Sequence, residues 1–211
     1  MLVGLDLDNT IVRYDGLFHR LACERGLIPD SVPVVKEAVR DHLRAAGAEE
    51  AWTELQGVVY GERMLEAEPF PGSLEFIATC VESNVEIVIV SHRTRRPYRG
   101  PQFDLHVAAL GWLRAAGVTD TARIGLGPDR IYLEETKEAK LERIASVGCT
   151  HFVDDLAEFL THPEFPGGVE RILFVPTSSR AASAALRNGS VTVVESWAEI
   201  SRHLLDLPAP R

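Results

Sequence analysis

The sequence predicts an α/β protein with a doubly wound, mostly parallel sheet and a small all-helical segment inserted after the first strand. Two observations support this. From residue 73 onward, short apolar runs alternate with stretches of helical spacing, and such alternation favours a parallel sheet with helices on both faces. Before that point, residues 13–70 lack strand-like runs and show helical spacing instead.

The first predicted strand is the apolar run Leu2–Leu7, which begins close to the N-terminus and ends among acids. Such a run is typical of a buried parallel strand. The inserted segment is rich in Ala, Glu, Arg and Leu, which are strong helix formers. Its three predicted helices are each followed by a glycine stop signal: Leu17–Arg25, Val34–Ala46 and Glu49–Val59.

The remainder of the chain alternates between predicted strands and helices. The strands are Val85–Val90, Arg130–Leu133, Thr150–Val153, Ile172–Val175 and Val191–Val194. The helices are Ser73–Ser83, Phe103–Ala116, Thr136–Val147, Ser179–Arg187 and Ser196–Leu205. In open sheets of this Rossmann-like kind, ligands bind beyond the carboxyl ends of the strands. The residues that follow each strand are therefore the candidates for function.

Composition and charge exclude several classes of protein. The 211 residues carry a net charge of −9, which argues against binding to a nucleic-acid polymer or a membrane surface. No basic leader and no apolar run long enough to span a bilayer is visible. The three cysteines are widely spaced in apolar contexts and are expected to be buried, reduced thiols. We therefore expect a cytoplasmic enzyme.

Two acid pairs follow two of the predicted strands. Asp6 and Asp8 follow the first strand, and Asp154 and Asp155 follow Thr150–Val153. Close carboxylates repel each other unless a cation is present. A hard cation with oxygen ligands, Mg²⁺, would relieve this repulsion, and Mg²⁺ sites use few carboxylates and commonly include substrate phosphate. Each side chain alone would also serve in a helix cap or turn, but the two pairs together favour phosphate chemistry.

A hydroxyl and a lysine belong to the same predicted sheet edge. Ser91 follows the strand Val85–Val90, where its hydroxyl and nearby N–H groups would hold a phosphoryl oxygen. In the helix Thr136–Val147, Lys137 shares the sheet-facing stripe with Leu141 and is the favoured site lysine. Lys140 is the alternative, and either lysine would also suit a solvated surface position.

At these points the sequence resembles the haloacid dehalogenase-like (HAD) superfamily of hydrolases. The first motif of that family, an apolar strand followed by DxDx[TV], is matched by Asp6-Leu7-Asp8-Asn9-Thr10. Its hydroxyl, lysine and acid-pair motifs are matched by Ser91, Lys137 (or Lys140) and Asp154–Asp155. The resemblance extends from Leu2 to at least Leu160. Asn9 stands where the family most often has Gly, and a turn position with positive φ suits either residue.

The resemblance implies a Mg²⁺-dependent phosphatase that hydrolyses a small phosphomonoester through an aspartyl-phosphate. Asp6 would be the nucleophile and Asp8 the general acid/base, with Ser91 and Lys137 stabilising the transferring group. The metal would be held by Asp6, the Asp8 backbone carbonyl and Asp155, with Asp154 a ligand or a water holder. Relatives that cleave carbon–halogen bonds generally lack the second acid, so Asp8 favours phosphoryl transfer.

The resemblance also implies that residues 13–70 form a C1-type helical cap on a core of residues 1–12 and 71–211. A cap that opens and closes favours a small phosphorylated metabolite as substrate. The arginine-rich stretch after Ser91 predicts recognition of a second anionic group, although a solvated charge run is the alternative. The expected substrate contacts are Thr10, His92, Arg93 and Arg96.

Other functions fit the same motifs. A phosphomutase would use the same site, and a phosphonate-cleaving enzyme would need a Schiff-base lysine in the cap, where Lys36 is the only lysine. A protein of another class, a non-catalytic binding or scaffold module, would keep only the fold. The intact acids Asp6, Asp8 and Asp155 argue against that module. The sequence leaves open whether the protein is a monomer or a homodimer.

Overall fold

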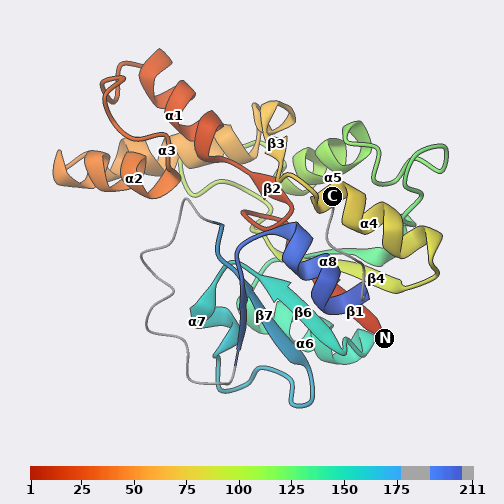
Figure 1. Ribbon diagram of the computed structural model, residues 1–211. Coiled ribbons are helices and arrows are strands. Elements are labelled where there is room, and N and C mark those ends of the chain that lie inside the picture. The colour runs from red at the N-terminus through yellow and green to blue at the C-terminus, as the bar shows by residue number, and fades with distance from the viewer. Residues whose placement is uncertain (177–190, 206–211) are drawn as a thin grey trace. The chain divides into compact units, whose positions relative to one another are not determined.

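The computed structural model describes residues 1–176 and 191–205 (Figure 1). Its main sheet has six strands in the order β5-β4-β1-β6-β7-β8, and every neighbouring pair is parallel. These strands are β1 (Leu2–Leu5), β4 (Glu86–His92), β5 (Ile131–Glu134), β6 (His151–Asp154), β7 (Glu170–Phe174) and β8 (Thr192–Val194). The predicted parallel sheet is confirmed, and β1 lies in its interior between β4 and β6.

The chain divides into two compact units. The core unit comprises Met1–Ile11, Pro69–His92 and Gly117–Arg211, and the helical unit comprises Val12–Glu68 and Arg93–Ala116. Helices of the core unit are α4 (Ser73–Glu82), η2 (Pro128–Arg130), α6 (Lys137–Val147), α7 (Ala157–Leu160) and α8 (Trp197–Leu205). Those of the helical unit are α1 (Asp15–Glu24), α2 (Lys36–Ala45), α3 (Glu49–Tyr60), η1 (Met64–Glu66) and α5 (Leu105–Ala115).

Helices cover both faces of the core sheet. Successive residues of a strand point to opposite faces, so neighbouring residues of β7 contact different helices. Leu173 of β7 belongs to a buried cluster with Leu141 of α6 and Phe159 of α7. The next residue, Phe174, instead packs its ring 5.9 Å from that of Trp197 in α8. The sheet is therefore doubly wound, as predicted.

Within the described residues, the predicted elements agree with the structure apart from their ends and a few short elements. The short helix α7 and the 3-10 helices η1 and η2 were not predicted. The predicted helix Ser179–Arg187 lies outside the described residues and stays a prediction. The inserted segment is not purely helical, because the two-residue strands β2 (Val12–Arg13) and β3 (Glu68–Pro69) pair with each other. Strands this short produce no recognisable alternation in a sequence.

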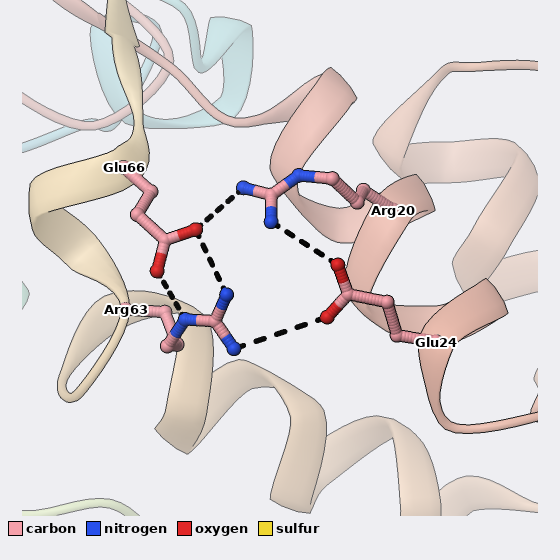
Figure 2. A network of polar contacts seen from close by, with 4 residues as sticks. All are labelled: Arg20, Glu24, Arg63 and Glu66. Atoms are coloured by element: carbon pink, nitrogen blue, oxygen red, sulfur yellow. Dashed lines mark hydrogen bonds and ion pairs between the residues drawn. The ribbon is translucent and has the colours of Figure 1, made fainter.

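The helical unit contains a segment that the sequence assigned to the core. Residues 93–116, which include α5, group with the inserted helices. One reason is that the indole N–H of Trp112, in α5, donates to the Ala67 carbonyl at 2.8 Å. The surface of this unit carries a closed ring of ion pairs between Arg20, Glu24, Arg63 and Glu66 (Figure 2). A capping role for this unit stays a prediction.

Within the described ranges, no helix combines the length and the apolar character that a membrane crossing would require.

Candidate active site

Three of the four predicted acids have carboxylates that lie close together at the carboxyl ends of β1 and β6. The two strands are neighbours, with Leu5 opposite Val153, and the Asp6 N–H donates to the Val153 carbonyl at 2.9 Å. This register places carboxylate oxygens of Asp6, Asp154 and Asp155 within 4.8 Å of one another. Asp6 and Asp154 are buried, whereas Asp155 is partly exposed.

A buried lysine connects this acid cluster to α6. The Lys140 ammonium donates to Asp6 Oδ1 at 2.6 Å and to Asp154 Oδ2 at 2.7 Å. Its side chain is only 4% exposed, and it lies over the Phe159 ring at 4.3 Å from the centroid. The start of α6 is fixed by Thr136, whose hydroxyl accepts from the Ala139 N–H at 3.1 Å.

The sequence-based preference for Lys137 is corrected by this geometry. Lys137 is exposed and forms an ion pair with Glu158 at 2.9 Å. The buried face of α6 contains Lys140, Leu141 and Ile144. Lys140 precedes Ile144 by four residues, so the two lie on the same helical stripe. Lys140 is about one turn farther than Lys137 from the N-terminal end of α6.

The charges of the cluster are strongly interdependent. Burial raises the pKa of Asp6 to about 7, Lys140 opposes this shift, and Asp154 and Asp8 reinforce it. Burial favours the neutral form of Lys140, but Asp154 and Asp6 outweigh it and raise the pKa of the lysine, which is therefore charged. One buried cation thus does not fully compensate the surrounding carboxylates, and a second cation would lower the pKa of Asp6.

Asp154 and Asp155 differ in their exposure to solvent. Asp154 Oδ2 accepts from Lys140, and its Oδ1 accepts from the Leu156 N–H at 2.8 Å. Asp154 thereby orients the lysine and the turn after β6. Asp155 is more exposed, so it is the better placed of the two to bind an ion directly together with Asp6.

Two further residues of the core unit, one after β1 and one near the end of β4, have buried hydroxyls. Thr10 Oγ1 and Ser91 Oγ are both fully buried and have no hydrogen-bond partner among residues 1–176 and 191–205. A buried hydroxyl left without a partner costs about 1–3 kcal/mol. Both positions would therefore gain from a ligand that brings oxygen atoms. Ser91 is the second-last residue of β4 and pairs with Leu133 of β5.

The turn after β1 has the shape expected from the sequence. Asn9 adopts a positive φ of 57°, in the left-handed region, which confirms the tolerance expected at this position. The Ile11 N–H closes the turn on the Leu7 carbonyl at 3.0 Å. The Thr10 carbonyl accepts from the indole N–H of Trp197 at 3.1 Å. Sequence reasoning missed Trp197, because a lone tryptophan near the end of the chain carries no motif.

His92 and Arg93 are consecutive in the sequence but belong to different units, His92 to the core unit and Arg93 to the helical unit. His92 ends β4, and burial, with Lys140 nearby, lowers its pKa. Arg93 is 4% exposed, and its guanidinium donates to the Tyr60 carbonyl and the Tyr14 hydroxyl, each at 3.1 Å. These contacts hold Arg93 inside the helical unit. A substrate contact through either residue stays a prediction.

The other arginines of this stretch also make contacts within the helical unit. Arg96 donates to the Gln102 carbonyl at 2.6 Å. Arg95 pairs with Asp104, and Arg99 pairs with Glu50 at 2.6 Å. The stretch is therefore not a fully solvated charge run. Anion recognition by Arg96 stays a prediction.

Comparisons with known proteins identify the fold. No protein-family model and no curated protein sequence matches the chain. Among solved structures, a HAD family hydrolase from Deinococcus radiodurans R1, with bound phosphate and sodium, aligns with a TM-score of 0.61 and 18% identity over 97% of this chain and 95% of its own. A haloacid dehalogenase-like hydrolase from Xanthomonas campestris aligns with a TM-score of 0.55 and 13% identity over 98% and 95%.

A third similar structure is CbbY from Rhodobacter sphaeroides in complex with xylulose-1,5-bisphosphate. It aligns with a TM-score of 0.52 and 15% identity over 94% of this chain and 95% of its own. The sheet order and the strand-end acids define a doubly wound α/β protein with a polar site at the carboxyl edge. More specifically, the chain has the fold of the haloacid dehalogenase-like hydrolases.

Proposed function

We propose that the protein is a Mg²⁺-dependent phosphatase that hydrolyses a small phosphomonoester through an aspartyl-phosphate on Asp6. The observation that carries this proposal is the setting of Asp6. Its carboxylate is buried, is held by Lys140 and lies among further acids. This arrangement suits a nucleophile that works beside a divalent cation.

The acid cluster fits a magnesium ion. Asp6 and Asp155 would hold it together with the backbone carbonyl of Asp8, and Asp154 would bind it directly or through water. The raised pKa of Asp6 supports this fit, because it reflects negative charge that a cation would neutralise. When bound, the ion would neutralise charge on the transferring phosphoryl group.

The chain's own residues account for both half-reactions. The Asp6 carboxylate attacks phosphorus in line, and the bond from phosphorus to the ester oxygen breaks as Asp8 gives that oxygen its proton. Asp8 then takes a proton from the water that attacks the aspartyl-phosphate. Inorganic phosphate leaves, and Asp6 is restored. The ammonium of Lys140 and the hydroxyls of Ser91 and Thr10 stabilise the phosphoryl oxygens.

Related reactions receive less support. Carbon–halogen cleavage does not need the second acid, Asp8. Phosphonate cleavage through a Schiff base needs a neutral lysine amine. The Lys36 ammonium instead lies 5.7 Å from the Tyr60 ring centroid and 5.8 Å from that of Phe18, so it is engaged in cation–π contacts within the helical unit. A phosphomutase would use the same residues and remains the closest alternative.

A small phosphorylated metabolite is the substrate class that we propose, and the cytoplasm is the compartment. The structure from Deinococcus radiodurans holds phosphate, and CbbY from Rhodobacter sphaeroides holds a sugar bisphosphate. Those ligands belong to those proteins. They support the choice of a phosphorylated small molecule here, together with the buried hydroxyls of Thr10 and Ser91.

The test is turnover of 4-nitrophenyl phosphate by the purified chain, with Mg²⁺ and after chelation of metals. We expect turnover that requires Mg²⁺ and that Asp6→Asn lowers by at least about 10³-fold, in line with the loss of a catalytic nucleophile. Glu158→Gln, which removes an exposed carboxylate from α7, serves as the matched control. Turnover that survives in Asp6→Asn, or no turnover by the unaltered chain, would reject the proposed phosphatase function.

A further inference from the structure

The loop that carries Asp8 is fixed by donors from distant parts of the core unit. The Thr10 carbonyl accepts from the indole N–H of Trp197, a residue 187 positions later in the chain, at 3.1 Å. The Ile11 carbonyl accepts from the Phe70 N–H at 2.8 Å and from the Ser73 hydroxyl at 3.3 Å. Two successive peptide groups of the loop are thus held from outside the loop.

Trp197 has little freedom to move. It is the first residue of α8 and is 1% exposed. Its ring packs against Phe76 and Phe174, with centroids 5.3 and 5.9 Å away. At Gly72, which has a φ of 87°, an added Cβ would lie 3.0 Å from the Trp197 Cβ. The direction of the indole N–H is therefore set by packing and not by the loop.

The position of the Thr10 carbonyl bears on Asp8 through a very short connection. Only Asn9, with its φ of 57°, separates Asp8 from Thr10. The turn closes between the Ile11 N–H and the Leu7 carbonyl at 3.0 Å. Rotation of the Thr10 peptide would therefore shift both Asp8 and the buried Thr10 hydroxyl. A misplacement of about 1 Å is enough to cost roughly 10²-fold in rate.

We propose that Trp197 is a positioning residue for the general acid. Its indole N–H fixes the Thr10 carbonyl and thereby holds Asp8 where it protonates the leaving oxygen. This inference rests on the proposed phosphatase function. It also predicts a specific kinetic pattern, because a displaced general acid slows the departure of a strongly basic leaving group more than that of a weakly basic one.

The experiment compares phenyl phosphate with 4-nitrophenyl phosphate, which differ mainly in the basicity of the leaving oxygen. Trp197→Phe keeps an aromatic ring but removes the N–H donor. We expect the ratio of kcat/KM for phenyl phosphate to kcat/KM for 4-nitrophenyl phosphate to fall by about tenfold, part of the 10²–10⁴-fold that general acid catalysis supplies. This ratio reports the step in which the leaving oxygen departs, whereas kcat also contains the hydrolysis of the aspartyl-phosphate, which is common to both substrates. A shift of the Thr10 hydroxyl should affect both substrates equally and cancel in the ratio, because they carry the same phosphoryl group.

Trp112→Phe is the matched control. Trp112 is also buried, and its indole N–H also donates to a backbone carbonyl, that of Ala67, at 2.8 Å. It lies in the helical unit, far in sequence from Asp8. The loss of a buried indole donor is thus common to both variants, but we expect the kcat/KM ratio to change only in Trp197→Phe. An unchanged ratio in Trp197→Phe, or an equal change in both variants, overturns the role of Trp197.

A second readout does not depend on activity. Hydrogen exchange at the Ile11 amide should become faster in Trp197→Phe than in the unaltered chain, and Trp112→Phe should leave it unchanged. If Trp197→Phe fails to fold, a benzothienylalanine at position 197 replaces the N–H by sulfur with little change of shape and decides the question. Absence of turnover in the unaltered chain would reject the proposed function itself. Normal turnover with an unchanged ratio would reject only the positioning role.

Discussion

Lys140 shows how much of the site depends on one side chain. Its ammonium holds Asp6 and Asp154 at 2.6 and 2.7 Å in a buried environment. Removal of the cation would leave two buried carboxylates without compensation. The pKa of Asp6 would then rise further, because Lys140 is the main group that lowers it. A protonated Asp6 is a poor nucleophile, so Lys140 supports the reactive form of Asp6 as well as its position.

We therefore expect Lys140→Met to lower kcat for 4-nitrophenyl phosphate by at least about 10²-fold, the usual cost of losing one charge-stabilising donor. Lys137→Met is the control, because its pair with Glu158 is exposed and exposed ion pairs contribute at most about 1 kcal/mol. Lys137→Met should stay within about twofold of the unaltered chain. Equal losses of kcat in both variants would show that Lys137, like Lys140, takes part in the active site.

The residues that sequence reasoning placed well are those whose position follows from strand ends. Asp6 and Asp154 follow buried apolar runs, and parallel strands bring such ends to one edge. The lysine was ambiguous, because a helical stripe accommodates two lysines three residues apart. No pattern in the sequence identifies Trp197, because its contact with Thr10 depends on how α8 packs against the sheet.

At the scale of elements, the helical unit is held partly by the ion-pair ring of Figure 2, which joins α1 to η1 and to Arg63 just before it. Arg20 and Arg63 both pair with Glu66. Arg63 and then Arg20 lower the pKa of Glu66 from 4.5 to about 2. A carboxylate whose pKa is lowered by folding stabilises the folded state at pH values above the pKa that it has in the unfolded chain. That contribution is complete above about pH 4.5 and is lost as the pH falls through about 2.

Glu66→Gln should therefore lower the free energy of unfolding at pH 7, measured by urea denaturation in low salt. The difference from the unaltered chain should narrow as the pH falls from 4.5 towards 2. It should also shrink in 1 M NaCl, where screening acts over about 3 Å. Glu62→Gln removes an equal charge in the turn just before η1 and should have a smaller effect. A difference that is independent of pH and salt would show that packing, not charge, is responsible.

The division into elements was largely predictable, because helical spacing marks α3 and α6 and a β-branched apolar run marks β4. Where the sequence misled, tertiary contacts decided. The segment with α5 was expected in the core, yet Arg93 and Trp112 bind backbone carbonyls of the helical unit. A sequence gives no direct sign of which unit a helix joins, since its apolar stripe fits either one.

At the scale of the whole molecule, the sheet brings together residues that are far apart in sequence. Lys140 lies 134 residues from Asp6 and 14 from Asp154. The acids of β1 and β6 and the lysine of α6 meet only when the core unit has folded. A ligand that bridges these acids should therefore stabilise the folded core as a whole, because the unfolded chain presents no such site.

Magnesium should raise the melting temperature through this linkage. A ligand at ten times its dissociation constant adds about 1.4 kcal/mol to the free energy of unfolding, or roughly 3–6 °C for a chain of this size. Asp155→Asn should lose most of the rise, because Asp155 is the more exposed acid beside Asp6. Glu158→Gln should keep it. Calorimetry with and without Mg²⁺ measures the shift, and an equal rise in Asp155→Asn would place the metal elsewhere.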